Sequence, residues 1–348
     1  MVPSTAIVNA PRDAQPLRLL AVADWSFSRT PTPTAEEPLA ALRRGRERHD
    51  LHVDDSVQSR LGFVRLAAAI AGALRRQRYD AIMPLYGSLT ALLCALVPGV
   101  PLVAAFAGTD INGELDEAGR PLVRALFGVA LSQLATLRAV EVVVPVPSMV
   151  PRLWSAGWRA RVHVIPAGVD TRRFVPLPQA EARDRLGLDP AARLVGFAAL
   201  DPDARVKRRD LAEAAVARLP ASLGARLQVI TDVAFEELPR WYAACNALVV
   251  TSDLEGGPVV VKEALACGLP VVGVDCGDVA EVIAGLDHCA IAARDPAALA
   301  AALAPILEER ARCAAGPARI AARYGLDAMG ERYRAVVERA AGQRRPAR

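Results

Sequence analysis

Short apolar runs alternate along the chain with segments of helical periodicity. The runs are rich in Val, Leu and Ile and nearly continuous, which is typical of strands buried on both faces of a parallel sheet. A first series comprises residues 17–23, 81–85, 101–105, 140–144 and 162–165. A second series comprises residues 194–198, 227–231, 247–251, 271–274 and 289–291. The pattern predicts an α/β protein with two parallel sheets, each covered by helices.

One Pro-bearing stretch, 174–178, separates the two series and predicts a single linker between two domains that face each other across a cleft. The stretch with His49 and His52 is polar and predicts a turn. Ligands of such sheets bind at the carboxyl ends of the strands, so we expect the chemistry in the loops that follow them. The predicted divisions are a disordered lead at 1–16, an N-terminal Rossmann-like domain at 17–170, a C-terminal Rossmann-like domain at 171–323, a helix at 324–340 and a flexible tail at 341–348.

Composition excludes several functions without changing the predicted fold. A chain of 348 residues, 53% of them apolar, can form two ordinary cores. The net charge of +4 is the difference between 42 basic and 38 acidic residues, and only 5% of residues are aromatic, so we expect no nucleic-acid partner. The six cysteines stand singly, which predicts reduced thiols and, with no secretory pattern ahead of them, a cytoplasmic protein. Pro and Gly interrupt the uncharged stretch 81–109, which favours strand, helix and strand over a membrane span.

Two basic segments, 39–49 and 61–78, place Arg residues beside apolar helical stripes. A helix of this kind can lie on an anionic membrane, which would make the protein peripheral at its inner face. It can equally be a surface helix whose Arg side chains keep their charged ends in water. The sequence leaves both interpretations open.

The most informative stretch, 251–275, predicts a strand, a glycine turn, a helix and a second strand. Gly256 and Gly257 allow the backbone to approach a ligand closely. Pro258 suits the first turn of a helix, and the free amides that follow it, from Val259 onwards, form a positive end that binds anions. A diphosphate is expected there.

Two carboxylates accompany this turn. Glu255 lies in the loop after the strand, and Glu263 lies eight positions later, in the first turns of the helix. One carboxylate can therefore stay in the loop while the other projects from the helix. Two hydrogen-bond acceptors at this separation suit the hydroxyl groups of a sugar.

A second loop supplies positive charge. The apolar strand at 194–198 leads into a loop that carries Arg205, Lys207 and Arg208, and a helix follows. Cations at the carboxyl end of a strand are well placed to neutralise a leaving nucleoside diphosphate, which transfer without a metal ion requires. The two loops together predict a site for a nucleotide diphosphate sugar.

The stretch 251–275 resembles the family 4 glycosyltransferases of the retaining GT-B class, whose signature is Glu, seven residues and Glu in the setting E-G-x-P and E-A-x-A-x-G-x-P-V-V. Within that family it is most similar to the teichuronic-acid-type branch, given VVKEALAC and the residues 275–283. The resemblance implies a GT-B fold whose C-terminal helix crosses back to the N-terminal domain. It also implies that Glu263 holds the donor ribose, Glu255 the transferred sugar and Lys207 the diphosphate, with Arg205 or Arg208 replacing an Arg that relatives carry earlier in the loop.

The resemblance implies no metal or other cofactor. Asp201 and Asp203 spell the Asp-x-Asp pattern that binds a metal ion in the other large glycosyltransferase class, but Asp-Pro-Asp is also common in turns. The segment 162–176 resembles the family's interdomain segment, with Ala167 in place of Asn. We therefore expect metal-independent transfer and a linker near this segment.

The N-terminal half departs from the family. Residues 106–110 resemble its F-H-G-S-D loop, but Ala107 stands where relatives have the His that points at the donor sugar. Asp110 remains a candidate for orienting the sugar or the acceptor, with the alternative that it caps its own loop. The glycine-rich first loop is also absent, because residues 24–29 read Asp-Trp-Ser-Phe-Ser-Arg.

These patterns predict a hexosyltransferase that uses a nucleotide diphosphate sugar and a lipid-linked or small-molecule acceptor, with retention, in cell-envelope glycan or natural-product synthesis. The family mechanism needs charge stabilisation and positioning more than a protein base, so the missing His does not abolish this prediction. The alternative is a catalytically degenerate GT-B subunit that binds nucleotide or supports a partner glycosyltransferase. A sugar-nucleotide epimerase and a lysine-bound pyridoxal phosphorylase are further alternatives, the latter disfavoured because the only two lysines, Lys207 and Lys262, lie in the donor-site segments.

Overall fold

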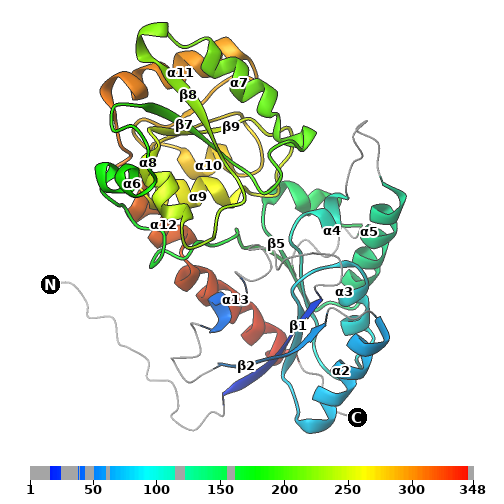
Figure 1. Cartoon of the computed structure of the whole chain (residues 1–348). Coiled ribbons are helices and arrows are strands. Elements are labelled where there is room, and N and C mark those ends of the chain that lie inside the picture. The colour runs from blue at the N-terminus through cyan, green and yellow to red at the C-terminus, as the bar shows by residue number, and fades with distance from the viewer. Residues whose placement is uncertain are drawn as a thin grey trace, which may run out of the picture.

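The computed structural model describes residues 16–24, 38, 40–43, 51–59, 63–113, 122–154 and 161–343. Figure 1 shows two α/β units, with the C-terminal unit above the N-terminal one. Residues 1–15 of the predicted lead and 344–348 of the predicted tail lie outside the described residues. In the described part of the chain, no helix combines the length and the apolar character that crossing a bilayer requires.

The N-terminal unit contains six parallel strands. Two three-stranded sheets have the orders β2-β1-β3 and β4-β5-β6, and a parallel bridge between Ile82 and Leu102 joins β3 to β4. The strands are β1 (Leu17–Asp24), β2 (Leu51–Ser59), β3 (Ala81–Pro84), β4 (Val103–Ala105), β5 (Glu141–Val144) and β6 (Val162–Val164). Five of them match the predicted runs, because each is a nearly unbroken apolar segment.

Strand β2 corrects the turn predicted at His52, whereas His49 lies outside the described residues. The register between β1 and β2 shifts in mid-strand, so the buried positions Leu51 and Val53 are followed by Val57 rather than by residue 55. This irregularity hides the alternation that identifies a half-buried strand. Asp54, which suggested a turn, accepts hydrogen bonds from the side chains of Tyr79 and Gln77 instead.

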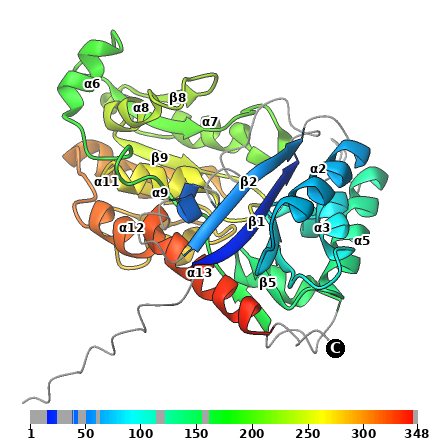
Figure 2. The ribbon, with the colours of Figure 1, turned by 90° about the horizontal axis from the view of Figure 1, so that it is seen from below.

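Successive residues of β1 face two different cores. Leu20 and Val22 pack with helices α2, α3 and α5, whereas Leu19 and Ala21 pack with helix α13, which covers the opposite face (Figure 2). This follows from the period of two along a strand. The helices are α2 (Phe63–Arg76), α3 (Ser88–Ala95), α4 (Thr109–Asn112), α5 (Val123–Thr136) and α13 (Leu326–Gly342).

The C-terminal unit contains one five-stranded parallel sheet of order β11-β10-β9-β7-β8. The strands are β7 (Arg193–Ala198), β8 (Ala225–Ile230), β9 (Ala247–Val250), β10 (Val271–Gly273) and β11 (Ala290–Ile291). The helices are α6 (Gln179–Arg185), α7 (Arg209–Ala217), α8 (Leu238–Ala244), α9 (Val259–Ala266), α10 (Val279–Ile283), α11 (Pro296–Glu309) and α12 (Gly316–Tyr324). All five strands coincide with the second predicted series, and the six cysteines are free thiols, as predicted.

Two chain segments connect the units and meet each other. Val169, on the way into the C-terminal unit, pairs with Gly325, on the way back out. The amide of Val169 donates to the carbonyl oxygen of Tyr324 at 2.8 Å, and its carbonyl oxygen accepts the amide of Leu326 at 3.0 Å. From there α13 descends along the N-terminal sheet (Figure 1). Gly330 permits the contact, because a Cβ at this position would lie 2.5 Å from the carbonyl oxygen of Ala41. The N-terminal core therefore includes the last helix of the chain.

A buried ion pair stabilises the C-terminal unit beneath the turn at residue 257. Lys262 on α9 is 0% exposed, and its Nζ lies 2.7 Å from Oδ2 of the buried Asp278, the residue before α10. The ring of Tyr324 lies 5.4 Å from the same Nζ. A buried charge is tolerated only when it is paired, so each of these two groups depends on the other.

Removal of one partner of this pair should destabilise the fold far more than removal of both. We expect Lys262→Ala to lower the free energy of unfolding by about 3–5 kcal/mol, because it leaves the carboxylate of Asp278 buried and uncompensated. The double variant Lys262→Met, Asp278→Leu should lose much less, since neither charge remains. Urea denaturation followed by circular dichroism measures both. A single variant as stable as the unchanged protein would contradict the assignment of a mutually dependent pair.

Candidate functional site

Two of the predicted donor-site residues, Lys207 and Glu255, come together at the carboxyl ends of β7 and β9. The loop after β7 contains the short 3-10 helix η4 (Arg205–Lys207), and the loop after β9 contains the Gly256–Gly257 turn. The backbone amide of Asp253 donates to the carbonyl oxygen of Val206 at 2.8 Å, which ties the two loops together. The site therefore lies where the sheet topology predicts it.

Two backbones meet at this turn, and glycine is required at Gly257. A Cβ on Gly256 would lie 3.5 Å from the carbonyl oxygen of Ala107, across the domain boundary. Gly257 has a φ of +108°, and a Cβ there would lie 3.3 Å from Val146. Pro258 precedes the first residue of α9, Val259, and closes the turn with a φ of −67°. The N-terminal end of α9 thus faces the boundary between the two units.

Lys207 and Glu255 form the central charge pair. The Nζ of Lys207 donates to Oε1 of Glu255 at 2.7 Å, and both side chains are partly exposed. The hydroxyl of Thr251, at the end of β9, lies 2.9 Å from the carbonyl oxygens of Lys207 and Arg208 and fixes the loop that carries this lysine. An anion that enters would find a lysine already oriented by a carboxylate.

Arg205 and Arg208 lie apart from this pair. Arg208 adopts a left-handed backbone conformation with φ of 51°, and its guanidinium donates to Asp210 at 2.9 Å and to Asp253 at 3.4 Å. The hydrogen bond to Asp210 is the main cause of its raised pKa. Both arginines line an open cavity of about 720 Å³ on the outer side of the loop, which Lys207 does not line. The sequence predicted that Arg205 or Arg208 takes the place of a phosphate-binding Arg that relatives carry earlier in the loop. Asp210 and Asp253 already bind the guanidinium of Arg208, which argues against this role for Arg208.

Glu263 lies below the turn, on the buried side of α9. It is 4% exposed, and its Oε2 accepts a hydrogen bond of 2.7 Å from the hydroxyl of Tyr242 on α8. Burial raises the pKa of Glu263 to about 7, although the hydrogen bond from Tyr242 acts in the opposite direction. No described residue donates to its other oxygen. A ligand hydroxyl could therefore donate a hydrogen bond to this second oxygen.

The cavity between these groups is small. It measures about 20 Å³, close to the room that one water molecule needs. Its walls are the ends of β7 and β9 with Lys207, Glu255 and Val260.

Asp110 has the loop-capping arrangement that the sequence left as its alternative role. It is buried, and its carboxylate accepts hydrogen bonds from the backbone amides of Gly87 at 2.8 Å, Ala107 at 3.0 Å and Gly108 at 2.8 Å. Burial raises its pKa, against the effect of these amides. Asp110 thus joins the loops after β3 and β4, and its oxygens are used inside the protein.

Three further residues organise the site, and sequence reasoning missed two of them. Arg294, beyond β11, donates to the carbonyl oxygens of Thr251 and Ser252, each at 2.9 Å, and so fixes the end of β9. Tyr242 holds Glu263, as described above. Neither belongs to a local pattern that links it to this loop. Asp201, considered as half of a metal-binding pattern, accepts the backbone amides of Asp203 and Ala204 and closes a turn.

Comparison with known proteins covers the same region. Residues 205–309 match the family model described as "Glycosyl transferases group 1". A D-inositol 3-phosphate glycosyltransferase of Frankia alni is 33% identical over 48% of this chain and 50% of its own length. A GDP-mannose-dependent alpha-mannosyltransferase of Mycobacterium tuberculosis is 32% identical over 53% of this chain and 52% of its own length. The chain thus spans about half the length of the curated relatives it matches.

Solved structures match over nearly the whole chain. A sucrose-phosphate synthase from Thermosynechococcus elongatus superposes with a TM-score of 0.70 at 19% identity, over 94% of this chain and 99% of its own. HepE of Anabaena, in complex with UDP and glucose, superposes with the same TM-score of 0.70 at 18% identity, over 93% of this chain and 100% of its own. These likenesses show the fold, which is GT-B, as predicted. Residues 205–309 of this chain are therefore similar to group 1 glycosyl transferases, and the curated relatives that it matches over about half their length are glycosyltransferases by name.

Proposed function

We propose that this protein transfers a hexosyl group from a nucleotide diphosphate sugar to a lipid-linked or small-molecule acceptor, with retention and without a metal ion. The observation that carries the proposal is the pairing of Lys207 with Glu255 at one end of the C-terminal sheet, in the loop that leads into α9, the helix that carries Glu263. All of them lie inside the segment that matches group 1 glycosyl transferases. Assignment to family 4 and to its teichuronic-acid-type branch remains a prediction.

Each group has a chemical task in this proposal. Lys207 and the free amides at the start of α9 neutralise the diphosphate as it leaves, the step that gains most from fixed positive charge. Glu263 accepts the ribose hydroxyls, and Glu255 exchanges part of its contact with Lys207 for hydroxyls of the transferred sugar. The leaving phosphate takes the proton of the acceptor hydroxyl, so the protein needs to position the reactants rather than supply a base.

The names of the relatives favour envelope or polar small-molecule acceptors. One relative acts on D-inositol 3-phosphate, and a Rhizobium meliloti relative is a mannosyltransferase of lipopolysaccharide core biosynthesis. The N-terminal unit, where the acceptor is expected, lies outside the segment that matches the family. We therefore propose the class of acceptor and a peripheral position at the membrane, with UDP- and GDP-linked sugars as the first donors to test.

One observation favours a second candidate, a GT-B subunit that binds nucleotide without transferring sugar. The peptide that joins Ala107 and Gly108 lies directly against Gly256, so a small residue occupies the place where the family has a His. If this contact persists with donor bound, no side chain from this loop reaches the sugar. Donor hydrolysis distinguishes the candidates, since a degenerate subunit would bind the nucleotide and release no sugar.

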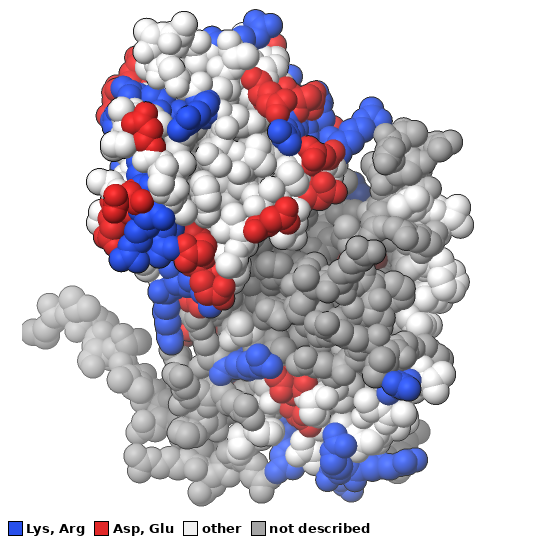
Figure 3. All heavy atoms as spheres, in the orientation of Figure 1, with Lys and Arg blue, Asp and Glu red and all other residues white. Residues whose placement is uncertain are grey.

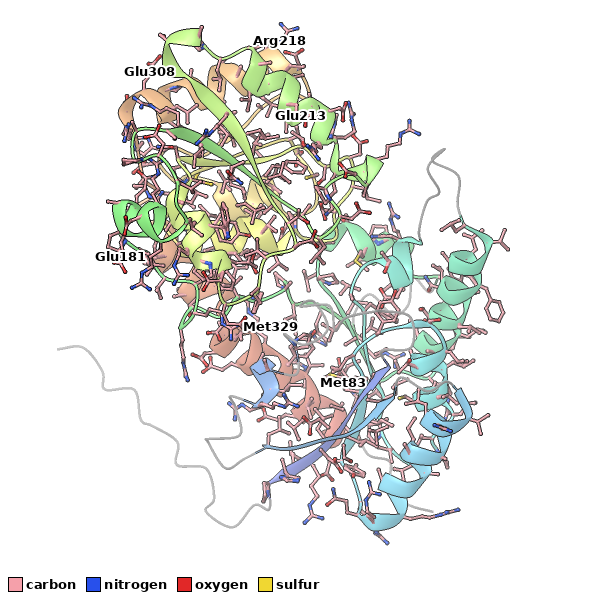
Figure 4. The ribbon with its side chains drawn as sticks, in the orientation of Figure 1. Met83, Glu181, Glu213, Arg218, Glu308 and Met329 are labelled. Carbon is pink, nitrogen blue, oxygen red and sulfur yellow. The ribbon has the colours of Figure 1, made fainter. Side chains whose placement is uncertain are left out.

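Substitution of the lysine should weaken nucleotide binding selectively. We expect Lys207→Ala to lower the affinity for the preferred nucleoside diphosphate roughly 10- to 100-fold, the range for loss of one charge-assisted contact. Calorimetry with UDP, GDP, ADP and dTDP, each with and without magnesium, measures this. The matched control is Arg218→Ala, an exposed cation on the outer end of the C-terminal unit (Figure 4). Equal affinities of Lys207→Ala and the control would reject the donor site.

The raised pKa of Glu263 predicts that nucleotide binding depends on pH. Because its pKa of about 7 lies above the ordinary value of 4.5, this carboxyl favours the folded state at low pH and withdraws that stabilisation as the pH rises through about 7. Ribose hydroxyls donate to the ionised form, so affinity should increase between about pH 6 and pH 8, with proton release near pH 7.

Calorimetry at pH 7 in buffers of different ionisation enthalpy measures that release directly. The variant Glu263→Gln keeps the shape and removes the titration, so its affinity should be lower and independent of pH over this range. A pH dependence that survives in Glu263→Gln would assign it to another group.

A further inference from the structure

Helix α5 of the N-terminal unit is polar on its buried side and apolar on its exposed side. Ser132, Gln133 and Thr136 are buried, whereas Val123 and Phe127 are 81% and 67% exposed. Surface helices of globular proteins have the opposite arrangement. Burial of large apolar side chains is therefore not what holds α5 against the N-terminal unit.

The inward polar side chains have structural partners. The hydroxyl of Ser132 accepts the backbone amide of Ser88 at 2.6 Å, where the loop after β3 enters α3. Gln133 donates to the carbonyl oxygen of Arg152 and accepts the amide of Trp154, at the end of the 3-10 helix η2 (Pro147–Arg152). The buried side of α5 therefore positions the loop before α3 and the end of η2, which accounts for its polar residues. These contacts do not account for the apolar residues on its exposed side.

The outward side forms one continuous stripe. An α-helix advances about 100° per residue, so positions 123, 127, 130, 134 and 137 fall on the same side. The large residues of this stripe that are exposed are Val123, Leu126, Phe127, Leu134 and Leu137. Leu96, which follows the adjacent helix α3, is 69% exposed and continues the apolar character. We call this surface, made of these six residues, the α5 stripe.

The described charged side chains on helices α2, α3 and α5 have one sign. Helices α2, α3 and α5 contain no Asp or Glu. Exposed arginines of this layer are Arg65, Arg75, Arg76, Arg78 and Arg138. Among the described atoms visible in Figure 3, the edge of the N-terminal unit over α5 is white with blue at its lower end and no red. The acidic residues 114, 116 and 117 precede α5 and lie outside the described residues.

We propose that the α5 stripe docks the protein on an anionic membrane surface. Apolar side chains that project from a helix, in a layer of helices whose described charged side chains are arginines, are suited to insertion among acyl chains while the guanidinium groups meet lipid phosphates. A second copy fits less well, because a two-fold contact would bring the same arginines of both copies towards each other. Five of the six side chains of the stripe are aliphatic and offer no planar platform for nucleic-acid bases.

Most of the α5 stripe lies on the same helix as Ser132, which supports a loop of the candidate site, so docking there would bring a membrane close to that site. Ser132, on the other side of the same helix, holds the loop that Asp110 ties to the loop facing Gly256. A membrane in contact with the stripe would therefore lie beside the acceptor-side loops. This use rests on the proposed transfer to a lipid-linked acceptor, whereas the docking itself does not.

Vesicle sedimentation with the full chain tests the proposal without any assay of transfer. We expect the protein to bind vesicles that contain one third phosphatidylglycerol and to bind pure phosphatidylcholine vesicles more weakly, with binding to the anionic vesicles falling at high salt. The double variant Phe127→Glu, Leu134→Glu should bind the anionic vesicles at least roughly tenfold more weakly, since it removes two apolar anchors and adds like charge.

The matched control is Leu177→Glu, which places one acid at an exposed leucine of the C-terminal unit and should bind as the unchanged protein does. An unchanged thermal midpoint and nucleotide affinity show that each variant is folded. Equal vesicle binding by the double variant and the control would overturn the proposal. A dimer in light scattering that the double variant alone abolishes would also overturn it, by assigning the stripe to a second copy. Loss of transfer with vesicle binding intact would count against the proposed function only.

Discussion

The close approach of two backbones at Gly256 determines how the rest of the site is built. On one side of this turn lies the peptide that joins Ala107 and Gly108, and below it lies Asp278, whose carboxylate is 3.4 Å from the place of a Cβ on Gly257. Lys262 neutralises that carboxylate from within α9, one position before Glu263. The same helix therefore supports the turn with one side chain and presents the buried acid with the next.

The GT-B fold could be predicted because its strands are nearly uninterrupted apolar runs. Ten of the described strands coincide with such runs, and the exception, β2, carries Asp54 and Asp55 and is irregularly paired with β1. Asp54 accepts from the side chains of Gln77 and Tyr79, and Asp55 pairs with Arg43, contacts that no rule of local sequence anticipates. Tertiary contacts thus overrode the local preference for a turn.

The candidate site could be predicted only where its residues share a local pattern. The turn at Gly256 and the start of α9 follow from glycine and proline, and the structure has them there. The family resemblance put Lys207 and Glu255 in one site with separate roles, but their direct ion pair joins residues 48 positions apart and was not predicted. Tyr242 acts through one hydrogen bond and Arg294 through three, each from a separate element, so no periodicity could indicate them.

The buried side of α5 is polar because it has to hydrogen-bond to neighbouring loops, and this leaves little room there for apolar side chains. Its inward side provides Ser132 and Gln133 to loops near the domain boundary, which leaves Ala135 as its one fully buried apolar residue among those described. A helix of 14 residues is marginal in water and normally gains stability from an apolar side packed on the core. Here the large apolar residues were placed outward instead, where they add nothing in water, so their contribution depends on a surface that removes them from it.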